Sequence, residues 1–398
     1  MRYRPLPSIV LIVLFTSAFG CGSAPAQQPP DPVFEAQTVD DDVAIGYGLA
    51  IGDVDGDGDP DVLLADKTEI VWYRNGDWQR FVIAENLTER DNVCITARDI
   101  NGDGRVEVAV GAQWNPGETS DPNASGSVHY LIRPSDPTQQ WEVVTLPNEP
   151  TVHRMHWAQT SAGDYALVVL PLHGRGNQGG EGAGVRVLAY LMPDDPRGDW
   201  ETILLDESLN MTHNFDVRSL GDRDRLYVGG RQGAVTVEPI GGMWMESSAE
   251  RIEGVGVDEG IGEIRYGRFG DADLITTIEP MHGNTVNVYL PGEEMQRHVL
   301  ADDFNQGHGL AAADLLGLGR DQIVAGWRDP NEADRVGIRL FVPVNASGTN
   351  WAEHVLDENT MAVEDLKVAD LDGDGRLDVV AAGRDTHNLI IYWNRTEM

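Results

Sequence analysis

Residues 53–61 read DVDGDGDPD, and this short stretch decides how the whole chain is interpreted. Aspartates stand at positions 1, 3, 5 and 9 of the stretch and a glycine at position 6: Asp53, Asp55, Asp57, Asp61 and Gly58. An EF-hand-type calcium loop takes oxygen ligands at those positions and uses the glycine for its turn. The stretch therefore predicts a calcium-binding turn.

The same pattern occurs twice more, and its flanks indicate what kind of turn it makes. The second copy has Asp99, Asn101, Asp103 and Glu107 as ligands, and the third has Asp370, Asp372, Asp374 and Asp378. Short apolar, β-branched runs such as VEVAVGA and LDVVAAG follow the loops, so each loop joins two strands rather than two helices. An acidic, solvated turn without metal is the alternative interpretation of each copy.

Similar units without the calcium ligands fill the rest of the chain. They include HNFDVRSLGDRDRLYVGG, GEIRYGRFGDADLITTIE, GHGLAAADLLGLGRDQIVAG and the more divergent HWAQTSAGDYALVVLPL. Seven units at a spacing of roughly 45 to 60 residues are typical of a propeller. The chain ends without a last outer strand, whereas VFEAQTVD near the start has that pattern and no blade of its own. We therefore predict an all-β, seven-bladed β-propeller over residues 33–398, closed by its N-terminal strand and carrying calcium-binding turns.

The charge and the N-terminus restrict partners and location. A formal net charge of -36 argues against nucleic acid as a partner, because phosphate binding needs clustered Lys and Arg. Residues 1–20 have two arginines, then a short apolar run and small residues, which predicts a signal peptide. Gly20 before Cys21 resembles a bacterial lipobox, which implies a lipid anchor on Cys21 and a flexible tether over residues 21–32. We expect a periplasmic or cell-surface lipoprotein, and otherwise a secreted protein.

The calcium-loop units resemble FG-GAP/VCBS-type repeats, and the resemblance covers essentially all of the chain after the tether. The family implies a propeller with bound calcium. Many of its members are adhesion or binding proteins, so the resemblance alone implies no activity. Any chemistry has to come from residues outside the repeat pattern.

Histidines stand at one position of several repeats. Six residues before the first position of the turn lie Tyr47, His213, His308 and Glu364. In the third unit, VHRMHW offers His153 or His156 for the same place. Inner strands of a propeller converge on one axis, so imidazoles from three blades can meet there as a zinc site requires. We predict zinc ligands at His156, His213 and His308, with Glu364 as a fourth ligand or as a partner that orients a histidine.

The loops after the second strand of each unit open on the same face and are rich in polar residues. They contribute His173, Arg175 and Asn177, then Glu279, His282 and Asn284, then Trp327 and Arg328, and finally Arg384. A lone histidine at such a place can also simply bond a neighbouring backbone group. The set as a whole favours a site for a polyhydroxylated substrate around an open zinc.

A second resemblance rests on VHRMHW, LHGRGN, MTHNFD, EPMHGN and NQGHGL. These stretches resemble the propeller domain of the aldos-2-ulose dehydratase/isomerase family, and the resemblance extends over the propeller alone. It implies a hydro-lyase that removes water from a keto-sugar such as 1,5-anhydrofructose by zinc-assisted β-elimination.

The resemblance also implies roles for single residues. Base and acid would be His173 and His282, and Arg175 and Arg328 would stabilise the enolate charge. Residues expected to contact the substrate are His153, Asn177, Glu279, Asn284, Trp327 and Arg384. The alternative is a lipid-anchored propeller that binds glycan or protein without any reaction, in which case calcium would be the only metal.

Overall fold

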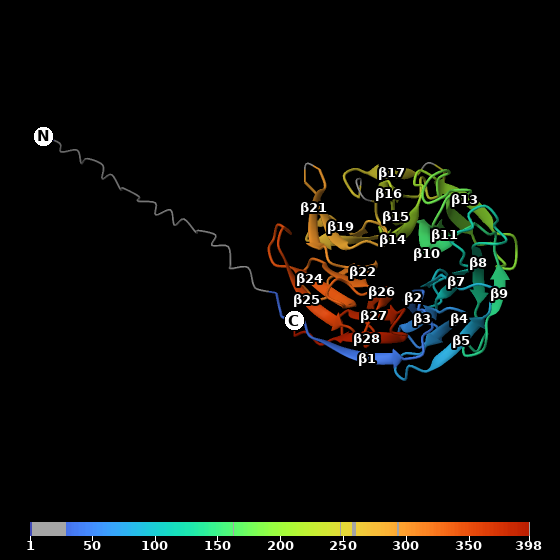
Figure 1. Cartoon of the computed structure of the whole chain (residues 1–398), viewed down its shortest axis with the longest axis horizontal. Coiled ribbons are helices and arrows are strands. Elements are labelled where there is room, and N and C mark those ends of the chain that lie inside the picture. Colours follow the sequence, from blue (N-terminus) through green and yellow to red (C-terminus); the bar gives the residue numbers. More distant parts are fainter. Residues whose placement is uncertain (2–28, 162, 247, 257–259, 293, 398) are drawn as a thin grey trace.

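The computed structural model describes residue 1 and residues 29–397, apart from 162, 247, 257–259 and 293. The expected signal peptide, Cys21 and most of the expected tether lie outside the described residues. The described chain is all β and forms seven four-stranded antiparallel sheets. Figure 1 shows these sheets arranged as blades around a central axis, so the predicted seven-bladed propeller is confirmed. Among the described residues, no helix is long and apolar enough to cross a membrane.

The innermost strands of the seven sheets form a ring around the axis, in which each strand contacts the next and β26 contacts β2. They are β2 (Gly48–Gly52), β6 (Cys94–Arg98), β10 (Val152–Ser161), β14 (Thr212–Ser219), β18 (Glu263–Phe269), β22 (Gly307–Ala313) and β26 (Val363–Ala369). The second strands are β3 (Asp61–Ala65), β7 (Glu107–Ala112), β11 (Asp164–Pro171), β15 (Asp224–Gly230), β19 (Ala272–Glu279), β23 (Gln322–Trp327) and β27 (Asp378–Gly383).

The third and fourth strands of each sheet lie progressively farther from the axis. The third strands are β4 (Glu69–Tyr73), β8 (Ser127–Ile132), β12 (Val187–Leu191), β16 (Gly233–Val237), β20 (Thr285–Leu290), β24 (Gly337–Pro343) and β28 (Asn388–Asn394). The outermost strands are β5 (Arg80–Glu85), β9 (Glu142–Thr145), β13 (Glu201–Asp206), β17 (Ala249–Ile252), β21 (Gln296–Ala301), β25 (Trp351–Glu358) and β1 (Phe34–Asp40).

The last sheet combines the two ends of the described chain. β1 pairs antiparallel with β28, from Phe34 opposite Asn394 to Asp40 opposite Leu389. The indole Nε1 of Trp393 donates to Oε1 of Gln37 at 2.8 Å across this pair. The other six sheets are each built from four consecutive strands.

The core lies between neighbouring blades. Trp157 of β10, for example, is almost fully buried against Tyr130 of the preceding blade, and its indole nitrogen donates to the carbonyl of Glu107 at 3.0 Å. A fully buried tryptophan contributes about 2–3 kcal/mol through the apolar surface removed from water. Interblade contacts of this kind hold neighbouring inner strands in fixed positions relative to the axis.

The tryptophans that precede several outer strands have one shared role. The indole nitrogens of Trp141, Trp200 and Trp351 each donate to a carbonyl of the turn just before the strand, at 2.7–3.1 Å. The recurring tryptophan therefore corresponds to a recurring local structure. Its large side chain packs on the blade, and its indole nitrogen fixes the turn by a hydrogen bond.

Candidate metal centre

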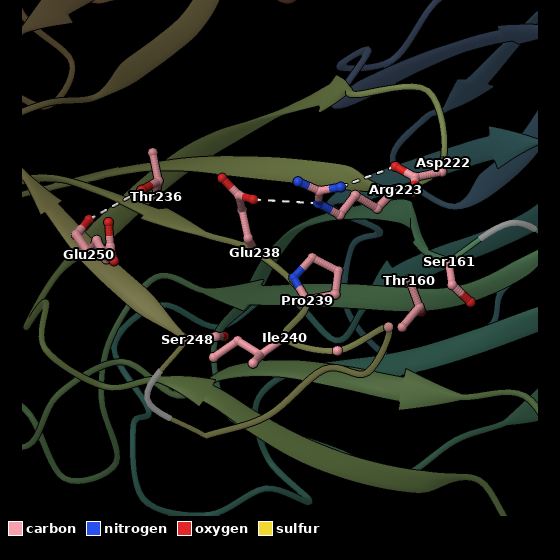
Figure 2. A pocket seen from close by; sticks show the side chains of 12 residues that line it. Thr160, Ser161, Asp222, Arg223, Thr236, Glu238, Pro239, Ile240, Ser248 and Glu250 are labelled. Atoms are coloured by element: carbon pink, nitrogen blue, oxygen red, sulfur yellow. Dashed lines mark hydrogen bonds and ion pairs between the residues drawn. The ribbon is translucent and has the colours of Figure 1, made fainter.

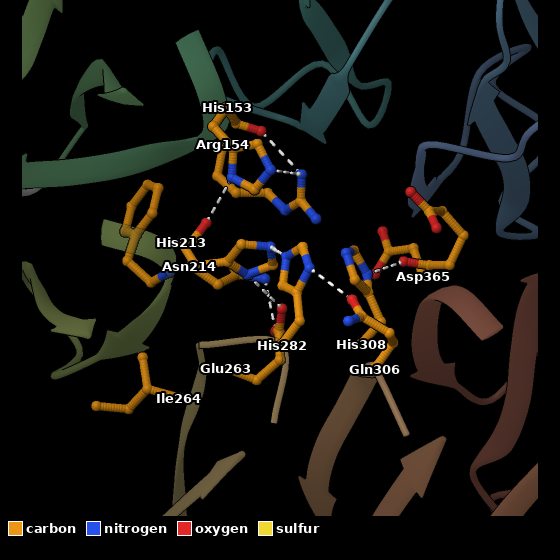
Figure 3. Close-up of polar contacts among 12 residues, drawn as sticks. His153, Arg154, His213, Asn214, Glu263, Ile264, His282, Gln306, His308 and Asp365 are labelled. Atoms are coloured by element: carbon orange, nitrogen blue, oxygen red, sulfur yellow. Dashed lines mark hydrogen bonds and ion pairs between the residues drawn. The ribbon is translucent and has the colours of Figure 1, made fainter. Parts of the chain in front are cut away.

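Three histidines meet at the axis of the propeller (Figure 3). His213 is the second residue of β14, His308 is the second residue of β22, and His282 lies in the loop after β19. Each offers one ring nitrogen to a group whose atoms all lie within 4.8 Å of one another. The ring centroids are separated by 4.3 to 5.0 Å. We call this group the histidine triad.

Each triad histidine has an oxygen beside its Nδ1 atom. His308 Nδ1 lies 2.5 Å from the backbone carbonyl of Glu364, and His282 Nδ1 lies 3.0 Å from Oε1 of Gln306. His213 Nδ1 lies 3.0 Å from the carboxylate of Glu263. At His308 and His282 the acceptor fixes the proton on Nδ1 and leaves Nε2 with its lone pair, as is usual for metal-ligating histidines. His213 Nδ1 and Glu263 are close but lie outside hydrogen-bond geometry.

The Nε2 atoms are the nitrogens that face the shared space. His213 Nε2 and His282 Nε2 are in direct contact, each with its Nδ1 atom next to an oxygen. Two lone-pair nitrogens repel each other unless a proton or a cation lies between them. The donor set is therefore one that a cation would stabilise.

Burial keeps these rings neutral. Desolvation lowers the pKa of His213 and His308 well below the usual value, and the neighbouring histidines add to the effect. Desolvation also lowers the pKa of His282, to about 4, with a further contribution from Arg328. A metal binds only the neutral imidazole, so at neutral pH the triad is in the binding form.

Backbone irregularities aim the residues at the axis. In four blades the inner strand has one extra residue relative to its neighbour, and this bulge falls at His153 in β10, at His213–Asn214 in β14, at His308 in β22 and at Glu364 in β26. A β-bulge leaves one residue out of the ladder and redirects its side chain. The repeated position seen in the sequence is therefore also a repeated backbone distortion.

The structure places His153, rather than His156, at the position that matches His213 and His308. His153 is the second residue of β10, its Nδ1 donates to the carbonyl of His213 at 2.7 Å, and the two rings are 4.5 Å apart. His156 is paired regularly with Val168 and packs edge-on against Phe215 at 4.8 Å. Three residues along a strand amount to about 10 Å and to the opposite face. His156 is therefore not a member of the triad. His282 takes the place that was predicted for His156.

The carboxylate of Glu364 is occupied by two arginines. Arg328 Nη1 donates to it at 3.0 Å and Arg384 Nη1 at 2.9 Å. Arg328 also donates to Gln306 at 2.9 Å, and Gln306 in turn contacts His282. Of the two roles predicted for Glu364, this arrangement favours the orienting one, because the residue accepts from His308 through its backbone and fixes the two arginines through its side chain.

Several predicted substrate residues are bound into the protein instead. The carboxylate of Glu279 is buried and binds Thr277, Tyr289 and Arg297. The side chain of Asn177 hydrogen-bonds within its own loop, and Trp327 is a core residue that packs at a tilted angle against Phe304. The polar loops thus use much of their hydrogen bonding for their own conformation.

The remaining predicted residues lie in the loops after β11 and β19. Arg175 forms a two-pronged pair with Glu149 at 2.8 and 2.6 Å. His173 is half-buried, and its Nδ1 atom is enclosed without a hydrogen-bond partner among the described residues. Asn284 is exposed and donates to the carbonyl of Asp302 at 3.2 Å.

Three residues next to the triad were missed in the sequence: Arg154, Glu263 and Gln306. Arg154 and Gln306 lie inside stretches that had been singled out for their histidines, VHRMHW and NQGHGL, and were overlooked as neighbours. Glu263 begins β18, next to the inner-strand position that carries histidines in other blades. A buried carboxylate at the start of an inner strand was the available signal.

The three acidic turns share one conformation. In each, a carboxylate oxygen of the first aspartate accepts from the amide of the glycine five residues later: Asp53 from Gly58, Asp99 from Gly104 and Asp370 from Gly375, all at 2.9 Å. The carboxylates of Asp53, Asp55 and Asp57 form one close group, and those of Asp370, Asp372 and Asp374 form another. All three turns join the first strand of a blade to the second, as predicted.

A cavity of about 580 Å³ opens at the opposite ends of the strands from the triad (Figure 2). It lies among the end of β10, the turn between β14 and β15, and the segment after β16. Arg223 and Glu238 face each other there at 3.6 Å, and Ile240 is 53% exposed. None of the described residues that line this cavity is a histidine, so it does not compete with the triad as a metal centre.

Comparisons with known proteins agree with both resemblances. The FG-GAP-like repeat family matches residues 53–110, which include the first two acidic turns. Aldos-2-ulose dehydratase from Phanerodontia chrysosporium is 24% identical over 364 residues, covering 82% of this chain. The chain spans only 37% of the length of that relative. The sequence similarity to a sugar dehydratase thus lies within a propeller-sized part of a larger protein.

Solved structures share the fold. A crystal structure of BBS1N in complex with ARL6DN matches with a TM-score of 0.57 and 12% identity, covering 91% of this chain and 96% of that one. A chain from the crystal structure of a mitotic checkpoint complex matches with a TM-score of 0.55 and 12% identity, covering 96% and 99%. At these identities the similarity concerns the propeller architecture alone.

Proposed function

We propose that this protein is an exported carbon–oxygen lyase that removes water from a keto-sugar by zinc-assisted β-elimination. The observation that carries the proposal is the histidine triad, in which three neutral imidazoles from different blades each offer one ring nitrogen to one group, while an oxygen lies beside each Nδ1. This donor set matches a catalytic zinc site that keeps a position open. The similarity to aldos-2-ulose dehydratase supports the choice of substrate class.

His213, His282 and His308 would hold the zinc, so His282 moves from the predicted acid–base pair to the ligands. When bound, the metal would supply polarisation of a substrate carbonyl. The protein contributes orientation: Glu263 holds His213, Gln306 holds His282, and the backbone of Glu364 holds His308. Loss of such a partner typically lowers metal affinity 10- to 100-fold.

His173 remains the proposed general base. Burial lowers its pKa, which keeps the ring neutral at neutral pH, and its Nδ1 atom has no hydrogen-bond partner in the described structure. In the proposed reaction it takes the proton from the carbon next to the carbonyl. The electron pair of that bond forms the new double bond, and the β-hydroxyl leaves as water with the proton that the His173 imidazolium returns to it.

The same proposal includes three further points: calcium in the three acidic turns, closure of the ring by β1, and export with a lipid anchor on Cys21. Two acidic turns place three carboxylates close together, where a divalent cation would relieve their repulsion. The pairing of β1 with β28 supports closure, since it joins the two ends of the propeller in one sheet.

One experiment tests the function directly. Purified protein is analysed for zinc and calcium by mass spectrometry and is then incubated with 1,5-anhydrofructose while the ultraviolet absorbance of a conjugated enone is followed. We expect about one zinc per chain and a rising absorbance that stops when zinc is removed. Calcium without zinc, together with no absorbance change, would show that the chain is a binding propeller instead.

A further inference from the structure

Arg154 is a buried cation beside the triad. It is the third residue of β10 and is 9% exposed. Its Nη1 atom donates to the carbonyl of His153 at 2.9 Å and approaches Nε2 of the same histidine at 3.3 Å. The His153 ring in turn lies 4.5 Å from that of His213 (Figure 3). Arg154 is therefore connected to the triad through a single imidazole.

In the described part of the chain, Arg154 has no carboxylate oxygen within 4.0 Å. Seven other cations of the inner strands and nearby loops are paired with carboxylates. The pairs are Arg265 with Glu263, Lys367 with Asp365, Arg328 and Arg384 with Glu364, Arg98 with Asp224, and Arg175 and Arg186 with Glu149. Arg154, which is buried, differs from these seven cations because it has no carboxylate partner among the described residues.

A buried guanidinium without a counterion is costly, so a ligand that carries the missing negative charge gains affinity from it. The nearest available carboxylates are already bound elsewhere. Glu263 binds His213, Asn214 and Arg265, and Asp365 binds Lys367. A divalent cation at the triad would add further positive charge to the same space. The positive charge of Arg154 also helps to lower the pKa values of all three triad histidines, which agrees with its closeness to them.

We infer that Arg154 is the anion-binding residue of this site and receives a negatively charged oxygen of a ligand held at the triad. The inference rests on the proposed function and deepens it by defining the charge of the ligand. The oxygen belongs either to a carboxylate that the substrate carries or to the enolate that forms when a neutral keto-sugar loses its proton. A guanidinium recognises both, through charge-assisted hydrogen bonds from its planar N–H groups.

A matched pair of small ligands tests the anion site without turnover. Glycolate and glycolamide have the same size, but only glycolate is charged, and their binding to zinc-loaded protein is measured by titration calorimetry. We expect Arg154→Gln to weaken the binding of glycolate at least about tenfold and the binding of glycolamide less than about twofold. Arg154→Met serves as a second uncharged variant, and Arg231→Gln, which removes an exposed arginine after β15, should change neither ligand.

A second measurement identifies the source of the charge. If it is a carboxylate of the substrate, glucuronate binds with the same dependence on Arg154, while kcat for 1,5-anhydrofructose is unchanged in Arg154→Gln. If it is the enolate, Arg154→Gln lowers kcat about 100-fold and leaves KM within about threefold, because the charge appears only after proton removal. Both results support the inference, and Arg154→Lys should recover part of the lost effect.

The outcomes separate this inference from the proposed function. If glycolate binds wild type and both uncharged variants equally, Arg154 is not the anion-binding residue, whereas the zinc site stands. If wild type binds no zinc, the proposed lyase fails, and the anion site is judged by the same glycolate comparison in metal-free protein. If glycolate binding to the metal-free protein does not depend on Arg154, the inference is overturned as well.

Discussion

His308 donates a hydrogen bond from Nδ1 to the backbone carbonyl of Glu364, 2.5 Å away, across the boundary between two blades. Both residues lie at the bulge of their inner strands. The bond therefore links two equivalent positions of neighbouring repeats, and it orients His308 without using the carboxylate of Glu364. That carboxylate remains free to hold Arg328 and Arg384 at the rim of the site.

The first prediction concerns the ligands. His213→Ala, His282→Ala and His308→Ala should each reduce bound zinc from about one to less than about 0.2 per chain, because a zinc site with two imidazoles left is weak. Activity on the keto-sugar should be lost in parallel. Metal analysis of the purified variants provides the measurement.

His156→Ala and His354→Ala are the matched controls for the ligand prediction. His156 lies in the same inner-strand ring but outside the triad, and His354 lies in β25, an outer strand. Both variants should retain full zinc. Zinc loss in His156→Ala, with His282→Ala unaffected, would restore the original ligand assignment and contradict the triad.

The second prediction concerns Glu263, which holds His213. Glu263→Gln keeps the shape of the side chain but weakens the acceptor at Nδ1, so zinc affinity should fall about 10- to 100-fold. Competition with a fluorescent zinc chelator measures this affinity. Saturating zinc should restore most of the activity, because Glu263 acts through His213. Activity lost at full zinc occupancy would indicate direct contact with the substrate instead.

The third prediction concerns calcium and pH. Burial raises the pKa of Asp61 and Glu107 to about 7 and that of Asp378 to about 6. A carboxyl whose pKa is raised on folding stabilises the fold while protonated, and this stability is lost as the pH rises through about 6–7. Calcium binds the ionised form and compensates for the loss. The decrease in melting temperature caused by EGTA should therefore be larger at about pH 8 than at about pH 5.

Two comparisons control the calcium experiment. Asp55→Ala and Asp372→Ala should each lower the melting temperature in calcium by roughly 2–6 °C and reduce the response to EGTA. Asp314, in the turn after β22 that lacks the other acidic ligands, already accepts from the amides of Leu318 and Gly319. Asp314→Ala should therefore leave the EGTA response unchanged. A melting temperature that EGTA changes at neither pH value would exclude calcium from the turns.

The fourth prediction concerns the pairing of β1 with β28. A variant that starts at residue 41 lacks β1 and exposes the edge of β28, whereas one that starts at residue 29 keeps both strands. The shorter variant should melt about 10 °C or more below the longer one and should self-associate through the open edge. Calorimetry and size-exclusion chromatography measure the two effects. Equal melting temperatures would show that β1 is dispensable for closure.

The sequence was sufficient for the fold because the repeat itself carries the information. The strand runs recur in all seven blades, whereas the acidic turn recurs in three of them and the leading tryptophan in several, each time at an equivalent point of the blade. The repeat position also brought His213 and His308 together correctly, since inner strands converge on one axis.

The rest of the site could not be predicted from the spacing of residues. His153 and His156 lie three residues apart in the most divergent unit, and only the bulge at His153 decides which of them reaches the axis. His282 comes from a loop, whose path the repeat pattern does not specify. Glu279 and Trp327 have residue types typical of a sugar site, but their side chains turn inward to hydrogen-bond or pack within the protein.

The sheet that joins β1 to β28 also determines when the molecule can finish folding. β1 is synthesised before the other 27 described strands, whereas its partner β28 is synthesised last of these. Six blades consist of consecutive strands and can form locally, but this blade needs one contact across nearly the entire chain. Pairing of β1 with β28 therefore has to wait until β28 has been synthesised, and β1 has no strand partner in this sheet before that point.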